Sequence, residues 1–193
     1  MTGPVPQQQP LPAARLTDPQ LERLAEDVTY VVETFAYAVD EVERLRARGE
    51  DNSHAFDVHV EAAAVLARAL HDFLCANGTK PDDLFAVHYA PNWTNPTVLS
   101  RDLRDVINKQ GPHLSTARLN KQGFDLPGIA ADVLREMVQF FDQLDVKRRK
   151  WFAKAELVAR DALTRLPATS TGPRFGPANQ PLPLGGIVVT TTN

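Results

Sequence analysis

Apolar residues recur at spacings of three and four over several long stretches of this chain, which is the period of an α-helix with one buried face. The longest such stretch runs from Leu21 to Leu45, follows Asp18 and Pro19, and ends in basic residues before Gly49. Aspartate and proline suit the first turn of a helix, and basic residues followed by glycine suit its end. The pattern therefore predicts one long amphipathic helix.

A second helix is predicted from the capping pair Asn52-Ser53 to Gly78. Its apolar stripe is rich in alanine, so a neighbouring helix can approach it closely. Over residues 79–96 the pattern breaks down, because three prolines interrupt any long element. Large apolar side chains are still frequent there, so we expect this connection to pack on the bundle. A connection of this length in a compact domain is often functional.

A third helix is predicted over residues 97–110, and the glycine–proline pair at 111–112 must interrupt or kink it. The last helical pattern starts after Asp125, and we expect this helix to continue to Leu166 with a bend near Asp145. No stretch shows the alternation of a strand. The sequence thus predicts an all-α protein, a bundle of four or five helices.

The two ends of the chain differ from its middle. Residues 1–16 are rich in proline and glutamine and predict a disordered arm, and residues 167–193 are rich in proline, glycine and threonine and predict a flexible tail. The bundle is therefore expected over residues 17–166 as one domain.

Composition narrows the function classes. The net charge of -3 argues against broad, sequence-blind binding of nucleic acid. A lone cysteine, Cys75, excludes an internal disulfide, lies in an apolar helical pattern, and is expected to be a small core residue in a reducing cytosol. No apolar run is long enough to span a membrane, and the first residues do not resemble a signal peptide. We expect a cytoplasmic protein without a membrane partner.

Metal and cofactor chemistry is disfavoured by the motifs. Phosphate-binding glycine loops, paired cysteines and the zinc-protease histidine motif are all absent from the sequence. His54 and His59 are five residues apart and do not share a helix face, so both are predicted to be surface residues. His71 lies beside the apolar stripe and is predicted to be a half-buried helix residue. We predict no metal site and no cofactor.

Charged residues on two predicted helices are candidates for binding an anion. Arg68 and Asp72 are four apart, which predicts either a surface ion pair or a pair of substrate-binding groups. Arg101, Arg104 and Asn108 follow at spacings of three and four and share one face. Such a row suits a phosphate-binding groove, and the alternative is a solvated helix face.

His113 is the candidate catalytic histidine, because the glycine–proline pair before it forces the chain to deviate. An imidazole at a helix break is well placed to titrate near neutral pH and to act as a general acid or base. The basic run from Lys147 to Trp151 is a second candidate for phosphate and base contacts. The favoured alternative is a solvated helix face, with Trp151 and Phe152 packing inward.

Two segments carry a resemblance to a known family. Residues 62–74, AAAVLARALHDFL, and residues 103–114, LRDVINKQGPHL, resemble consecutive helices of small bacterial proteins similar to HEPN domains. The Arg-x-x-x-Asp-Phe and Ile-Asn-Lys-x-x-x-His elements occur in the expected order. The resemblance implies a bundle of four or five helices that forms a homodimer.

Many HEPN domains are metal-independent ribonucleases with an Arg-x4-6-His motif at the dimer interface. The resemblance places His113 at the motif histidine, where it would move protons. The arginine position five residues earlier holds Asn108, with Lys109 beside it and Arg104 one helical turn before. The proline before the histidine is a further departure from the motif.

The resemblance thus predicts an RNA-binding or RNA-cleaving protein of a bacterial defence or toxin–antitoxin system. Its catalytic group would be His113, Arg104, Asn108 and Lys109, and its substrate-binding group Arg68, Asp72 and Arg101. The alternative is a non-catalytic helical dimerisation or interaction module that binds a partner protein. A third interpretation is a small-molecule sensor with a pocket among Phe85, Tyr89 and Trp93.

Overall fold

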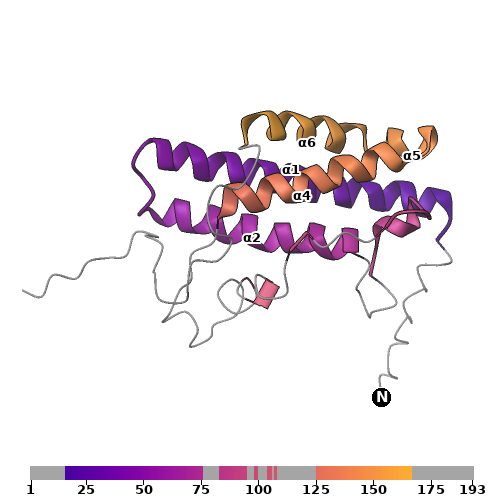
Figure 1. The fold of residues 1–193 in the computed structure, drawn as a ribbon, viewed down its shortest axis with the longest axis horizontal. Coiled ribbons are helices and arrows are strands. Elements are labelled where there is room, and N and C mark those ends of the chain that lie inside the picture. The colour runs from indigo at the N-terminus through magenta and orange to yellow at the C-terminus, as the bar shows by residue number, and fades with distance from the viewer. Residues whose placement is uncertain are drawn as a thin grey trace, which may run out of the picture.

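The computed structural model describes residues 16–75, 83–94, 98–99, 104–105, 107 and 125–166. Within these residues every regular element is helical and none is a strand, which confirms the prediction of an all-α bundle (Figure 1). The predicted tail lies outside the described residues, as does the predicted arm apart from its last residue. Within the described part, no helix combines the length and the apolar character needed to cross a membrane.

Helices α1 (Asp18–Ala47) and α2 (His54–Cys75) form an antiparallel pair (Figure 1). The residue that precedes α1 is Thr17, one position earlier than expected, and its backbone N–H donates to Oε1 of Gln20 at 2.9 Å. Gly49 ends the turn after α1 with a φ of 70°, a left-handed conformation that favours glycine. Ser53 Oγ then accepts from the backbone N–H of Phe56 at 3.1 Å and starts α2, as predicted.

The connection after α2 belongs to the core, as expected. Its short 3₁₀ helix η2 (Ala86–His88) is followed by Tyr89 and Trp93, which are both buried. The Tyr89 hydroxyl donates to the carbonyl oxygen of Leu21 at 3.0 Å, and Nε1 of Trp93 donates to the carbonyl oxygen of Leu74 at 2.8 Å. These two bonds join the connection to the start of α1 and to the end of α2, which lie at the same end of the helix pair.

The last part of the bundle departs from the sequence prediction. Instead of one bent helix to Leu166, three helices follow: α4 (Leu126–Gln143), α5 (Val146–Trp151) and α6 (Ala153–Arg165). The expected bend is a reversal, because Asp145 Oδ1 accepts from the backbone N–H of Arg148 at 2.9 Å and starts a new helix. Helix α6 then runs back across α4 and α1 (Figure 1).

Phe140 of α4 lies where these elements meet. Its ring centroid is 5.3 Å from that of Phe73 on α2, 5.7 Å from that of Trp93 on the connection, and 5.5 Å from that of Phe152 before α6. All three pairs have the edge-to-face geometry that aromatic rings prefer. Burial of each such side chain stabilises the fold by about 1.5–3 kcal/mol. The aromatic cluster therefore holds α2, α4, α6 and the connection together.

Only short pieces of the predicted third helix are described. Arg104, Asp105 and Ile107 are helical there, and Leu99 and Ile107 are buried, as their apolar pattern predicts. These two side chains belong to the apolar core. Val98 and Leu99, which the prediction placed at the start of this helix, are not helical.

Candidate functional site

The predicted catalytic and substrate-binding residues are only partly described. Arg101, Asn108, Lys109 and His113 lie outside the described residues. Arg104, Arg68 and Asp72 are described, and Arg104 is helical and half-buried.

Arg68 and Asp72 form the surface ion pair that their spacing predicts. Nε of Arg68 lies 3.4 Å from Oδ2 of Asp72, and both side chains are well exposed. Such a pair contributes about 0.2–1 kcal/mol. Of the two alternatives that the sequence left open for these residues, a surface ion pair or a pair of substrate-binding groups, the structure shows the ion pair.

His71 is buried more deeply than the sequence suggested. Its exposed fraction is 2%, and apart from the hydroxyl of Tyr89, the indole N–H of Trp93 and the thiol of Cys75 it brings the polar side-chain atoms of the described core. Its Nδ1 atom accepts from the backbone N–H of Leu99 at 3.1 Å and lies 3.2 Å from Sγ of Cys75. Because Nδ1 accepts, the ring proton of neutral His71 belongs on Nε2. His71 therefore joins α2 to the segment that leads into the third helix.

The electrostatics of this cluster favour uncharged side chains. Burial lowers the pKa of His71 from 6.5, and the positive charge of Arg104 lowers it further. The charge of Asp72 raises this pKa, and the charge of Arg68 has the smallest effect and lowers it. Burial also raises the pKa of the Cys75 thiol. Since both groups are neutral near pH 7 and sealed from water, they hold the fold rather than act as a nucleophile and base.

His71 shows which of the predicted residues the fold brings together. The charges of Arg68, Asp72 and Arg104 all affect the pKa of this one imidazole, so these three side chains lie within electrostatic reach of His71. Nε of Arg104 is buried and has no hydrogen-bond partner among the described residues. Sequence reasoning missed the His71–Cys75 contact, although their spacing of four on one helix is the signal that predicts it.

Three of the four cations in the basic run 147–150 are paired with groups of this molecule. Lys147 Nζ lies 2.7 Å from Oδ2 of Asp18, Nη1 of Arg148 donates to the Tyr89 carbonyl oxygen at 2.7 Å, and Arg149 pairs with Asp142 and Glu156. Phe152 is buried and Trp151 half-buried, as the favoured interpretation predicted. These cations fasten α5 to its neighbours, which disfavours a role in gripping phosphate.

The described residues gather no metal centre: no group of three or more His, Cys, Asp or Glu side chains is placed to hold an ion. Tyr89 and Trp93, expected to line a small-molecule pocket, are core residues whose polar atoms are already bonded. The buried positions of Tyr89 and Trp93 therefore do not support the small-molecule sensor that the sequence offered as a third interpretation.

The described surface does carry an apolar face, made by α1 and α2 on the side away from the core. On α1, Tyr30 and Tyr37 are 66% and 59% exposed and lie two turns apart on one side. On α2, Val58 and Val65 have the same spacing and are also exposed. The Tyr37 ring packs edge-on against His59 of α2, with the ring centroids 6.0 Å apart. We call this surface, with Ala62 and Ala69 between and beyond the valines, the α1–α2 face.

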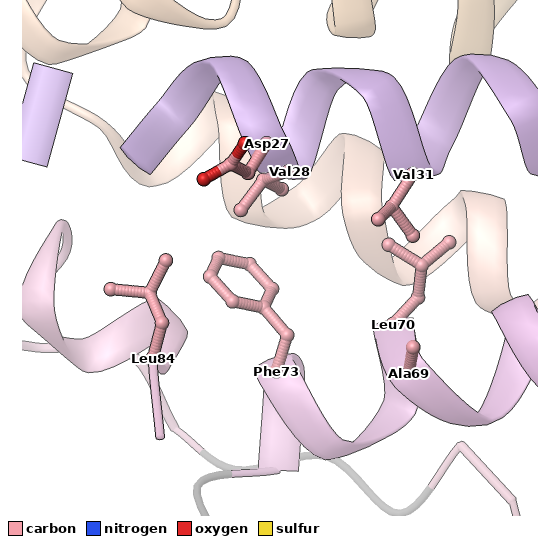
Figure 2. Close-up of a pocket in the computed structure, with 7 residues that line it drawn as sticks. All are labelled: Asp27, Val28, Val31, Ala69, Leu70, Phe73 and Leu84. Atoms are coloured by element: carbon pink, nitrogen blue, oxygen red, sulfur yellow. The ribbon is translucent and has the colours of Figure 1, made fainter. Parts of the chain in front are cut away.

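A small apolar pocket opens at one end of the α1–α2 face, with a volume of about 160 Å³ (Figure 2). Asp27, Val28 and Val31 come from α1 and face residues of α2 across it. The remaining lining residues come from α2 and from the connection: Ala69, Leu70, Phe73 and Leu84. The spacing of the exposed apolar residues in the sequence is the signal that predicts this face.

No family model, no curated protein and no solved structure matches this chain. The class of protein that the fold and the surface define is an all-α bundle with an apolar face on its first helix pair.

Proposed function

We propose that this chain is a helical interaction module that binds a protein partner through the α1–α2 face. The observation that carries the proposal is the exposure of Tyr30 and Tyr37 in one row on α1, beside Val58 and Val65 on α2. Single exposed apolar residues are ordinary, but several at regular spacing on neighbouring helices suit an interaction surface. Tyrosine is also among the residues enriched at the energetic centres of interfaces.

The spacing within the face favours a helical partner. Tyr30, Thr34 and Tyr37 follow at four and three residues on α1, and Val58, Ala62, Val65 and Ala69 follow at four, three and four on α2. Apolar residues at this spacing on neighbouring helices are the pattern to which a third helix packs. The polar residues that flank both rows suit the rim of such an interface.

A photo-crosslinking amino acid at Tyr30 or Tyr37 tests the proposal in the cells that make the protein. The matched control carries the same amino acid at Leu157 on α6, which is 69% exposed and lies outside the α1–α2 face. We expect one discrete adduct from each position on α1 and none from Leu157. Its mass would distinguish a second copy of this chain from another protein. Equal yields of adduct at all three positions, or no adduct at any of them, would refute the proposal that the α1–α2 face binds a partner.

The second candidate function is metal-independent cleavage of RNA, which the resemblance to HEPN domains implies. One observation favours it: the charges of Arg104 and Arg68 both lower the pKa of His71, so an arginine from each of the two resembling segments lies within electrostatic reach of this ring. Guanidinium groups suit a phosphate backbone.

The test for this function is incubation of purified protein with total RNA in the absence of divalent metal. Products with 2′,3′-cyclic phosphate ends that vanish in both His113→Ala and Arg104→Lys would support the enzyme. Persistent cleavage by His113→Ala would exclude it. The two candidate functions can be tested separately. Tyr30 and Tyr37 lie on α1 and do not belong to the predicted catalytic group, so a change at either tyrosine tests the interaction module alone.

A further inference from the structure

The pocket in the α1–α2 face is too small for a metabolite and the right size for one side chain. Binding sites for small molecules usually measure about 300–1,000 Å³, whereas a cavity of about 150 Å³ accommodates a single benzene ring. This pocket measures about 160 Å³, and its lining is almost wholly apolar. Its size and lining fit one leucine, methionine or phenylalanine side chain from another polypeptide.

Asp27 gives the pocket a second chemical character. It is the one charged residue of the lining, and it is exposed on α1 at the edge of the apolar surface (Figure 2). Among the described residues no ion pair is made by Asp27, and Arg23 one turn before it does not reach it. Three acidic residues of α1 are paired across the bundle, Asp18 with Lys147, Glu33 with Lys154 and Asp40 with Arg165. Glu22 and Glu26 of α1 are exposed and, like Asp27, make no ion pair among the described residues, but they do not line the pocket.

We infer that the pocket receives an apolar anchor residue of an amphipathic helix whose lysine or arginine, one helical turn from the anchor, pairs with Asp27. The inference deepens the proposed function, on which it rests. Residues three or four apart on a helix lie on the same side, so a single helical partner supplies both groups. The exposed tyrosines of α1 provide further contact surface for this helix.

A selection from a displayed library of amphipathic helical peptides, made against the full-length protein, tests the inference. We expect the enriched peptides to share a large apolar residue with lysine or arginine three or four positions away. Ala69→Phe fills the pocket from an exposed position, and it should weaken the best peptide at least about ten-fold, the loss expected when one large apolar side chain is excluded. Ala62→Phe, two turns away on the same row, is the matched control and should leave the pocket open.

Asp27→Asn tests the charge without changing the shape of the side chain. It should weaken binding by about two- to five-fold, as for an exposed ion pair, and this loss should disappear at high salt. Glu26→Gln makes the same charge change one residue away, outside the pocket lining, and should have no such effect.

Three outcomes would overturn the inference. One is enrichment of peptides without a basic residue, and another is binding that Ala62→Phe weakens and Ala69→Phe does not. The latter would leave the proposed function intact, because the peptides would still use the α1–α2 face. The third is a wild-type dimer that Ala69→Phe converts to a monomer, which would assign the pocket to a second copy of this chain.

Discussion

Replacing His71 with leucine removes a buried hydrogen-bond acceptor while keeping a side chain of similar size. In the wild-type protein Nδ1 of His71 accepts the backbone N–H of Leu99 at 3.1 Å, and both residues are buried. In the leucine variant this N–H stays buried without its acceptor. A buried polar group left unsatisfied costs about 1–3 kcal/mol. The free energy of unfolding should therefore fall by about this amount near neutral pH.

The pH dependence of this loss is the sharper part of the prediction. Burial and the Arg104 charge lower the pKa of His71 in the folded protein below 6.5, the value expected in the unfolded chain. Its stabilising effect is then complete above pH 6.5 and is lost as the pH falls towards the folded-state pKa, because the unfolded chain binds the proton more readily. The wild-type slope from this group is at most about 1.4 kcal/mol per pH unit.

Urea unfolding of the two proteins between about pH 7.5 and 5.5 measures the effect, since this is the range in which histidines titrate. We expect the difference in unfolding free energy between wild type and His71→Leu to shrink on acidification. His88, whose pKa burial also lowers, is present in both proteins and cancels in the comparison. A difference that stays constant across the range would refute the argument that neutral His71 holds Leu99.

Three further changes test other parts of the fold. Tyr89→Phe removes the bond to the Leu21 carbonyl, and it should lower the unfolding free energy in a urea titration by about 0.5–1.5 kcal/mol. Gly49→Ala should cost about 1 kcal/mol in the same assay, because φ is 70° there although a Cβ atom would meet no neighbour; an unchanged midpoint would contradict this reasoning. Glu156→Gln should destabilise at neutral pH and have less effect on stability as the pH falls. The hydrogen bond from Arg149 lowers the pKa of Glu156 from 4.5, so the stabilising effect of the Glu156 carboxylate is present above that pH and is lost below it. Thermal melts of the two proteins in acid and at neutral pH measure this difference.

Local signals in the sequence were enough to predict most of the helices. The apolar period and the flanking residues gave α1 within one residue, and Ser53 and Asp125 cap α2 and α4 as expected. These features depend on near neighbours in the chain, which a sequence shows directly. The burial of the connection was also predicted from its large apolar residues.

What the sequence did not show depends on distant contacts. Asp145 suits both a bend and a new cap, and the reversed chain is held by contacts that the local sequence does not show, among them the packing of Phe152 against Phe140 and Phe141. His71 was expected to be half-buried because its deep burial requires the backbone of Leu99, 28 residues away. Charge pairs such as Lys147 with Asp18, 129 residues apart, likewise have no local signature.

The two bonds from Tyr89 and Trp93 have a consequence for anyone who edits this chain. By length and composition the segment between α2 and the next helix looks like a loop that a shorter turn could replace. Its rings, however, occupy the space at the open end of the first two helices and take up a carbonyl of each. A deletion there would therefore do more than shorten a turn. It would remove buried rings from one end of the bundle and expose the space that they now fill to water.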